Sequence, residues 1–538
     1  MSAPYGAGTS VRARPRRLVK GNEVNESRRP VRSSRSKWLL AVGLVGMVSL
    51  GGTALVSFAH GDGRSRPEAG KSSSRQPAAN ASDEWPVTEC GTVDGTGCAP
   101  TDKRVDLVRP QFSDPLHITN PLFPVSNLHS VVQLGVVEGK PFRSETTTLP
   151  VTGTVDWFGL KIPVVLSQYT AWLDGRIEEI ALDRFAQADD GSVWYFGEDV
   201  TDYEDGVAKF TEGTWLAGRD GPPSMVMPAH PKVGDVFRVE NVIGIVFEEL
   251  TVTKVDQTLD GPNGPVTGAI VVDELGAGGG HSEKTLAPGY GEFLTTNETE
   301  REEMAVASPT NSMPGGVPSA VRKIVTAATG ELEYVRAEDW ETAATTTERI
   351  QAQFDIVDAT QQPPLVMAAL TTALGSLTSS VEAKNVNQAE TAAVDIAQSA
   401  IDLEARYLGH LEIEIARFHN HVQRLRVHAA ADDLGGVVGE VASLEWITER
   451  LRGALGAATQ RSLDTGMRDL RGASDDENVA AAADHAIRVA NNLRNTAPAP
   501  DASPICPPET DKSKRQCENN GEGVPQRCND GDGSSECS

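Results

Sequence analysis

The pattern of hydrophobic and polar positions divides the chain into three regions. Residues 38–59 form one uncharged and mainly apolar run. From about residue 105 to residue 308, short runs rich in β-branched and aromatic residues alternate with turn signals. After residue 316, apolar residues recur at intervals of three and four. The three patterns predict a membrane-spanning helix, an antiparallel β domain and a group of packed helices, which is a multidomain α+β fold.

The β region is marked by repeated Asp-Gly pairs, which are strong hairpin signals between strand-like runs. The pairs are Asp174-Gly175, Asp190-Gly191, Asp205-Gly206 and Asp260-Gly261, with Pro262-Asn263-Gly264-Pro265 just beyond the last. The strand-like runs between and around them include 164–173, 176–187, 193–197 and 266–274. We therefore expect an antiparallel β meander that closes into a half-barrel.

The helical region shows a seam with a period of about 3.5 residues. One helix carries it at Ala389, Ala393, Ile396, Ala400, Leu403 and Tyr407. Such seams, joined by short loops such as Leu408-Gly409, are typical of an antiparallel helical bundle. The expected helices lie near 336–358, 364–383, 386–407, 410–431, 437–456, 460–472 and 476–494.

Charge changes this picture by giving the chain a direction across a membrane. The chain carries 49 Lys+Arg and 75 Asp+Glu, a net charge of −26. Residues 1–37 hold ten basic and two acidic residues and are therefore positively charged. The net negative charge of the chain comes entirely from the residues after the apolar run. The positive-inside rule then predicts a single-pass plasma-membrane protein with a cytoplasmic N-terminus and its bulk outside. As an alternative, the small-x-small triplet ending at Ala59 predicts secretion after cleavage near that residue.

The six cysteines agree with export, because all of them follow the apolar run and their number is even. Cys90 and Cys98 close a short loop with the sequence CGTVDGTGC. The other four lie in a polar C-terminal tail, where three pairings are open and zinc is the rival explanation. The predicted disulfide residues are Cys90, Cys98, Cys506, Cys517, Cys528 and Cys537.

Together these patterns predict six segments. They are a basic cytoplasmic tail (1–37), a transmembrane helix (38–59), a stalk with a small disulfide loop (60–104), a β-rich domain (105–312), a helical bundle (317–495) and a Cys-containing polar tail (496–538).

Two stretches of the β region contain recognisable sequence motifs. Residues 183–206 read DRFAQADDGSVWYFGEDVTDYEDG, and residues 213–221 read GTWLAGRDG. In these motifs the chain resembles a widespread, uncharacterised family of exported bacterial β-rich proteins, and the resemblance covers about residues 115–300. The late phrase Ala287-Pro288-Gly289-Tyr290-Gly291 is similar to one in half-barrel, lipid-carrier-like proteins. Further motifs are Ala393-Val394-Asp395 through Asp402-Leu403-Glu404, Glu414-Ile415-Ala416-Arg417-Phe418 and Leu444-Glu445-Trp446-Ile447. In these the chain also resembles a recurrent, uncharacterised bacterial helical module, over about 340–490. The resemblances imply an extracytoplasmic β-rich domain followed by helices, and no activity.

The word WYFGE within this stretch suggests a ligand site. Alternation along a strand puts Trp194 and Phe196 on one face of the sheet and Tyr195 on the other. An aromatic pocket with carboxylate anchors is one interpretation, and a structural corner whose carboxylates bind turn amides is the other. The candidate ligand-binding residues are Asp183, Trp194, Tyr195, Glu198, Trp215 and Asp220.

The helices offer one candidate metal pair. His410 and Glu414 are one helical turn apart, so they are candidate ligands of one ion. The competing interpretation is a salt-bridged helix face. Across the Leu408-Gly409 turn, Asp402 is expected near Glu414 and Arg417, in an ion network that fixes the register of the helices.

The sequence contains no catalytic signature. G-x-S-x-G, H-E-x-x-H, the P-loop and G-x-G-x-x-G are all missing, so no catalytic residue and no cofactor are predicted. The acidity is a poor match to phosphate backbones and excludes nucleic acid as a partner. The expected partners are the membrane, through residues 38–59, and a lipid, small molecule or envelope component. We therefore predict a membrane-anchored extracytoplasmic ligand-binding protein or envelope-interaction scaffold. The alternatives are a hydrolase of envelope glycans that uses Asp183 and Glu198, and a purely structural envelope protein.

Overall fold

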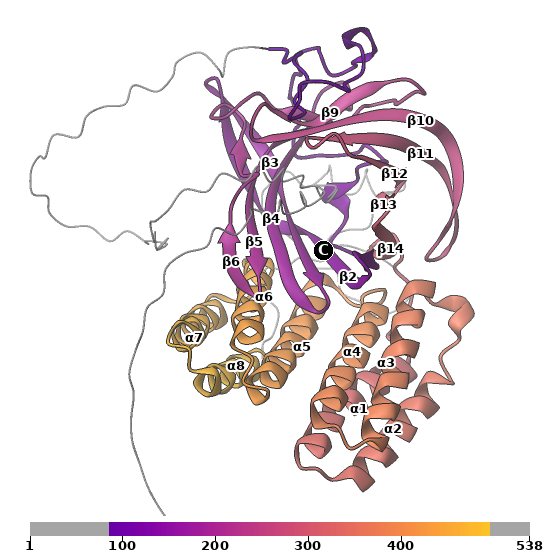
Figure 1. Cartoon of the computed structure of the whole chain (residues 1–538), viewed down its shortest axis with the longest axis vertical. Helices are drawn as coiled ribbons and strands as arrows, with labels where there is room; N and C mark the ends of the chain where they lie inside the picture. The colour runs from indigo at the N-terminus through magenta and orange to yellow at the C-terminus, as the bar shows by residue number, and fades with distance from the viewer. Residues whose placement is uncertain (1–84, 495–538) are drawn as a thin grey trace, which may run out of the picture. The chain divides into compact units, whose positions relative to one another are not determined.

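The computed structural model describes residues 85–494, which contain a large antiparallel sheet followed by eight α-helices (Figure 1). This confirms the predicted α+β architecture. Cys90 and Cys98 form a disulfide, as predicted. The expected transmembrane helix at 38–59 and the four tail cysteines lie outside the described residues.

The sheet is built from fourteen strands in the described part of the chain. They are β1 (Ser130–Val137), β2 (Lys140–Trp157), β3 (Leu160–Leu173), β4 (Arg176–Gln187), β5 (Val193–Glu204), β6 (Val207–Phe210), β7 (Trp215–Leu216), β8 (Ser224–Met227), β9 (Val236–Val242), β10 (Val246–Gly261), β11 (Gly264–Gly276), β12 (His281–Ala287), β13 (Gly291–Thr296) and β14 (Glu300–Ser308).

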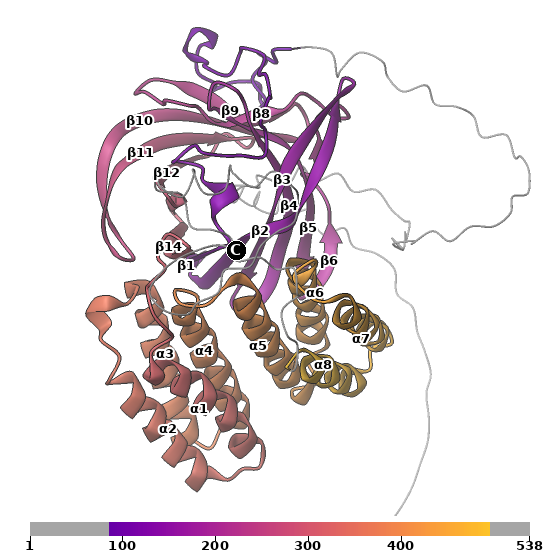
Figure 2. The same cartoon turned by 180° about the vertical axis from the view of Figure 1, so that it is seen from behind.

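The topology is a meander whose first and last strands pair with each other. The order is β6-β5-β4-β3-β2-β1-β14-β13-β12-β11-β10-β9, and β1 lies antiparallel to β14 with Val131 opposite Ala307. Strand β8 pairs with β5 and leads directly into β9, so the two ends of the meander are brought toward each other. Strands β10 and β11 curve strongly, as Figure 2 shows. The sheet therefore has an inner face that can surround a core.

The predicted turn signals all lie at or next to chain reversals. Asp174-Gly175 joins β3 to β4 and has positive φ at both residues, as a two-residue hairpin turn requires. Asp205-Gly206 does the same between β5 and β6. Asp190-Gly191 lies in the turn between β4 and β5, where Gly191 has positive φ. At the fourth signal Gly261 still pairs with Gly264, so the chain reverses at Pro262-Asn263, just beyond Asp260-Gly261.

The segment before the sheet is attached to it. Trp85 packs against Trp194 with ring centroids 5.5 Å apart. Arg104 forms a bridge with Val236 at the start of β9 and an ion pair of 2.6 Å with Asp106. Residues 85–104, which the sequence assigns to the stalk, thus belong to the folded β domain.

The helices form two groups of four, each with its own apolar core. The first group is α1 (Ser319–Arg336), α2 (Trp340–Phe354), α3 (Pro364–Glu382) and α4 (Val386–Glu404). The second group is α5 (His410–Ala430), α6 (Leu434–Leu451), α7 (Ala457–Asp475) and α8 (Val479–Leu493). Seven of these helices match the predicted ones closely, and α1 was missed. Helix α3 is long and apolar enough to cross a membrane, but its residues Leu370, Leu374 and Leu377 are buried in the first core.

A buried ion network joins the sheet to the helices. Glu145 of β2 lies 2.6 Å from Arg450 of α6, 2.7 Å from Arg143 and 3.4 Å from Arg417 of α5. Arg417 also pairs with Glu414 at 2.7 Å. Two further ion pairs complete the network, Arg143 with Asp402 at 2.7 Å and Arg450 with Glu414 at 3.3 Å. Burial by itself raises the pKa of Glu145, but the three arginines hold it well below its usual range.

The predicted network around Asp402, Glu414 and Arg417 is therefore present, with a strand residue at its centre. Further contacts support the same interface. Trp172 of β3 stacks on His421 of α5, with ring centroids 5.5 Å apart. Gly206 lies so close to the helix backbone that a Cβ there would be 1.8 Å from the carbonyl oxygen of Gly435. The sheet and the second helical group are thus packed tightly against each other.

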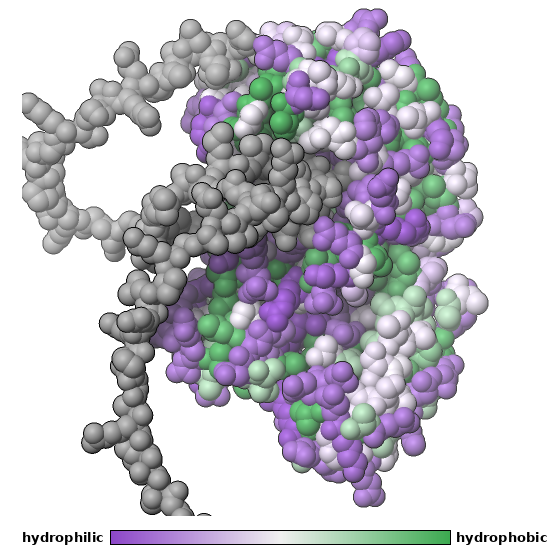
Figure 3. Space-filling view, viewed as in Figure 1, coloured by the Kyte–Doolittle hydropathy of each residue, from purple (hydrophilic) through white to green (hydrophobic). Residues whose placement is uncertain are grey.

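On the face shown in Figure 3, hydrophilic and hydrophobic residues are interspersed. The most exposed large apolar side chains of the described part are Val93, Val108 and Ile356, which come from unrelated segments. Scattered exposed apolar residues are normal on a protein surface. The exposed apolar residues of the described part therefore form no single patch.

Candidate functional site

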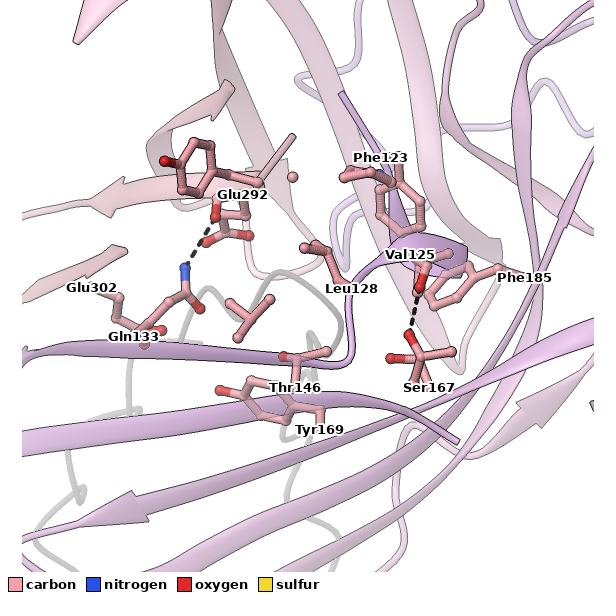
Figure 4. Close-up of a pocket in the computed structure, with 15 residues that line it drawn as sticks. Phe123, Val125, Leu128, Gln133, Thr146, Ser167, Tyr169, Phe185, Glu292 and Glu302 are labelled. Carbon is pink, nitrogen blue, oxygen red and sulfur yellow. Dashed lines mark hydrogen bonds between the residues drawn. The ribbon is translucent and has the colours of Figure 1, made fainter. Parts of the chain in front are cut away.

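A partly open cavity of about 70 Å³ lies on the inner face of the sheet (Figure 4). Its wall is formed by β1, β2, β3, β4, β13, β14 and the segment that precedes β1. A water molecule needs roughly 10–15 Å³ of such space, so the cavity has room for about five waters or a group of similar size. The cavity is therefore small, with space for a few non-hydrogen atoms.

One side of the cavity is apolar. Phe123, Val125 and Phe185 gather there, and the Phe123 and Phe185 rings meet edge to face at 4.9 Å. Val125 belongs to the short turn η2 (Val125–Asn127), whose position is fixed by a hydrogen bond from the Thr148 hydroxyl to the Val125 carbonyl oxygen. The wall is thus supported by both the sheet and the entry segment.

The other side is polar and centres on Glu292 of β13. Figure 4 shows Gln133, Glu292 and Glu302 together on this side. The Gln133 side chain donates to the backbone carbonyl of Glu292, and the Thr295 hydroxyl donates to Glu292 Oε1. Within the described residues, Glu292 Oε2 has no hydrogen-bond partner although the residue is only 7% exposed. This oxygen is a buried acceptor that the protein leaves open.

The polar side carries an excess of acid. Burial raises the pKa of Glu292 to about 8, although Lys284 and Thr295 act in the opposite direction. Burial and then the charges of Glu302, Glu292 and Glu300 raise the pKa of Tyr169 well above its usual range. Lys284 is buried beside Glu274, with which it forms an ion pair of 2.5 Å. Several carboxyl groups therefore share this interior with one lysine that is already paired.

Four of the residues predicted from the sequence form a cluster directly behind the cavity wall. Asp183 of β4 and Glu198 of β5 are opposite each other in the sheet, and Trp215 is opposite Glu198. The Tyr195 hydroxyl donates to Asp183 Oδ1 at 2.6 Å. Tyr195 also stacks on Phe185, which lines the cavity, with ring centroids 4.8 Å apart. The predicted cluster and the cavity are thus neighbouring parts of one interior.

The carboxyl groups of this cluster are placed to hold protons. Burial raises the pKa of Asp183 to about 8, and burial together with Glu240 raises the pKa of Glu198 well above its usual range. The neighbouring Glu240 contributes to this rise in the pKa of Glu198, because two nearby carboxyl groups disfavour ionisation of each other. The Trp215 indole donates to Glu240 at 3.4 Å. The cluster is therefore a set of buried carboxyl groups whose environment favours the protonated form.

The other two predicted ligand residues lie elsewhere. Trp194 is on the opposite face of the sheet from Tyr195, as alternation predicts, and its indole donates to the Ser192 hydroxyl. Asp220 accepts a hydrogen bond from the backbone N–H of Leu216 and pairs with Arg219, so it stabilises a turn. Neither residue lines the cavity.

The candidate metal pair is engaged by arginine. Both oxygens of Glu414 contact arginines, one with Arg417 and one with Arg450. His410 Nε2 lies 3.1 Å from the carbonyl oxygen of Arg450. Within residues 85–494, no group of three or more His, Cys, Asp or Glu side chains is placed to hold a metal ion.

The sequence interpretation missed the cavity residues Tyr169, Glu292 and Glu302, and it missed Glu240. The three glutamates could have been found from the alternation along their strands. Residues i and i+2 of a strand lie on the same face, and each of these glutamates falls on the face that points to the interior. A buried charge within a strand-like apolar run is uncommon and deserves a functional hypothesis.

Comparisons with known proteins add no name to this geometry. No protein-family model matches the chain, and no curated protein matches it significantly.

Proposed function

We propose that this protein is a membrane-anchored extracytoplasmic binding protein whose β domain holds a small amphipathic molecule in its interior cavity. The observation that carries the proposal is the cavity itself, with an apolar side at Phe123 and Phe185 and an open buried acceptor at Glu292. Cavities of this composition are the usual form of small-molecule sites. The location rests on the basic tail and the apolar run at 38–59, and the resemblance to exported bacterial proteins supports it.

The open polar atoms explain why occupation would be favourable. A buried polar group without a partner costs about 1–3 kcal/mol, and a ligand that supplies the partner recovers that cost. Ser167 provides a second such atom, because its buried Oγ also has no partner among the described residues. The protein thus presents polar groups on both sides of a space that an apolar body can fill.

The hydrolase alternative receives less support from this geometry. Asp183 and Glu198 are both fully buried, and neither lines the cavity. A glycan substrate needs carboxyl groups on either side of an accessible cleft. The binding function therefore agrees better with the observed positions.

Native mass spectrometry of the full chain, purified from its host in nanodiscs, tests the proposal. We expect a co-purifying small molecule in the wild type. The variant Val125→Phe fills the cavity from the η2 turn and is expected to lose that molecule. Asn127→Phe is the matched control, because Asn127 lies in the same turn but is exposed. Identical spectra for the wild type and Val125→Phe would contradict the proposal.

A further inference from the structure

The charge of the cavity lining points to the chemistry of the ligand. Among the described residues that line it, the only charged side chains are Glu292 and Glu302. Both belong to the polar side of the cavity in Figure 4. The lining contains no lysine, arginine or histidine. A ligand that enters this space meets acid and no base.

The lysine near the cavity, Lys284, already forms an ion pair with another residue. Lys284 is fully buried and pairs with Glu274 at 2.5 Å, and Glu248 contributes to the same environment. Glu300, close to Tyr169, receives a hydrogen bond from the Asn297 amide at 2.7 Å, which is a neutral partner. Lys284 therefore acts on Glu292 only as a nearby charge that does not outweigh burial, and no ion pair with Glu292 is formed within the described residues.

The open oxygen of Glu292 requires a hydrogen-bond donor when the carboxylate is ionised. Thr295 occupies Oε1, and Oε2 has no partner within residues 85–494. An ammonium group provides several donors together with the missing positive charge, whereas a carboxylate ligand would place like charges together. Charge-assisted hydrogen bonds of this kind are the stronger ones in proteins.

We propose that the ligand is a small primary amine with an apolar body, whose ammonium group pairs with Glu292 while its hydrocarbon part lies against Phe123, Val125 and Phe185. This inference rests on the proposed function, because it names the chemical class of the molecule that the cavity binds. The enclosed volume of about 70 Å³ corresponds to roughly five non-hydrogen atoms at the space that one water needs.

Binding has a defined proton balance. Burial raises the pKa of Glu292 to about 8, so the free protein holds a proton there at pH 7. When the ammonium group arrives, the carboxyl O–H bond breaks, the proton leaves to solvent, and the ion pair between carboxylate and ammonium remains. Binding at pH 7 therefore releases about one proton per amine. The affinity rises with pH up to about 8, where Glu292 ionises in the free protein, stays level above that pH and falls once the amine loses its charge.

The test compares three ligands that share one hydrocarbon chain: butylamine, butanol and butyrate. Calorimetric titration of the full chain is carried out in two buffers with different ionisation enthalpies, which measures proton release. We expect butylamine to bind at least about ten-fold more tightly than butanol, with proton release only for the amine, and butyrate not to bind.

The variant Glu292→Gln keeps the shape of the side chain and an acceptor for Thr295 but removes the charge. It is expected to lose about ten-fold or more in butylamine affinity and to abolish proton release, so that butylamine no longer binds more tightly than butanol. Glu283→Gln is the matched control, since Glu283 lies on the neighbouring strand β12 with a side chain that is 59% exposed. This control should bind butylamine like the wild type.

The outcomes separate the two proposals. If butanol binds as tightly as butylamine and Val125→Phe blocks both, the cavity is a binding site but the amine inference is overturned. If none of the three ligands binds and Val125→Phe changes nothing in native mass spectra, both proposals fail. Competition by phosphatidylethanolamine in the nanodiscs would support an amine that belongs to a lipid head group, and its absence together with butylamine binding would support a free amine.

Discussion

Two regions of the molecule bury several charged groups, and they treat them in opposite ways. At the contact between sheet and helices, Glu145, Asp402 and Glu414 are matched by Arg143, Arg417 and Arg450. In the interior of the sheet, carboxyl groups such as Asp183, Glu198 and Glu292 have no arginine or lysine of their own among the described contacts.

The two regions shift the pKa values of their buried carboxyl groups in opposite directions. Despite burial, arginines hold the pKa of Glu145 well below its usual range and also lower the pKa of Glu414. Burial raises the pKa of Asp183 and of Glu292 to about 8. A matched network fixes two elements relative to each other, whereas unmatched acids leave a place for a proton or for a cationic ligand.

The largest expected effect comes from breaking the matched network. Arg450→Met removes one of three arginines and leaves Glu145 and Glu414 with an uncompensated buried charge. We expect a loss of about 3–5 kcal/mol in unfolding free energy, measured by urea denaturation followed by circular dichroism.

Arg452→Met is the control for this variant, because the Arg452 side chain is 43% exposed and pairs with Glu449 at the surface. Surface pairs contribute about 0–1 kcal/mol, so this variant should unfold close to the wild type. If both variants lost the same free energy of unfolding, the buried network would contribute no more to stability than a surface ion pair.

The second prediction concerns pH and the interior acids. The pKa of Asp183 is about 8 in the folded protein, whereas an unperturbed aspartate has a pKa of 3.8, as expected in the unfolded chain. The native state therefore holds a proton that the unfolded chain loses, and the stability contribution falls as the pH rises from about 4 to about 8. The lowered pKa values of Glu145 and Glu414 act in the opposite direction, with stability lost as the pH falls below their usual range.

Asp183→Asn isolates the interior part of this pH dependence. Asparagine keeps an acceptor for the Tyr195 hydroxyl and does not titrate. Relative to the wild type, the variant should therefore gain stability between pH 5 and pH 8 in urea denaturation experiments. A constant difference between the two proteins at both pH values would mean that Asp183 is not protonated in the folded state.

A smaller effect is expected for Tyr195→Phe, which removes one hydroxyl from the interior cluster. The hydroxyl donates to Asp183 at 2.6 Å, and loss of a buried hydrogen bond costs about 1–2 kcal/mol. Thermal unfolding should show a lower Tm for this variant. Tyr334→Phe on α1 is the control, since Tyr334 is exposed, and its Tm should not change.

Much of the fold could be predicted because its signals are local. Asp174-Gly175 specifies a hairpin through the positive φ of both residues, and the seam from Ala389 to Tyr407 specifies a helix through its spacing. The missed helix α1 carries the same signal at Val321, Ile324, Ala328, Leu332 and Val335. The turn between β10 and β11 carries two adjacent signals, Asp260-Gly261 and Pro262-Asn263, and the pairing of Gly261 with Gly264 decides which of them reverses the chain.

The site could be predicted only in part because its residues meet through long-range pairing. Asp183, Tyr195 and Glu198 come from one hairpin, so their proximity follows from local register. The cavity depends on β1 pairing with β14, which brings residue 133 next to residues 292 and 302. No local pattern specifies that closure.

Infrared difference spectroscopy of the full chain at pH 7 tests the central contrast most directly. The carbonyl stretch of protonated carboxylic acids separates them from ionised carboxylates. We predict such a band in the wild type, a weaker band after Glu292→Gln or Asp183→Asn, and no change after Glu145→Gln at the matched network. Loss of part of the band on addition of butylamine would connect it to the ligand site. A wild-type spectrum without protonated carboxylic acid at pH 7 would contradict the account.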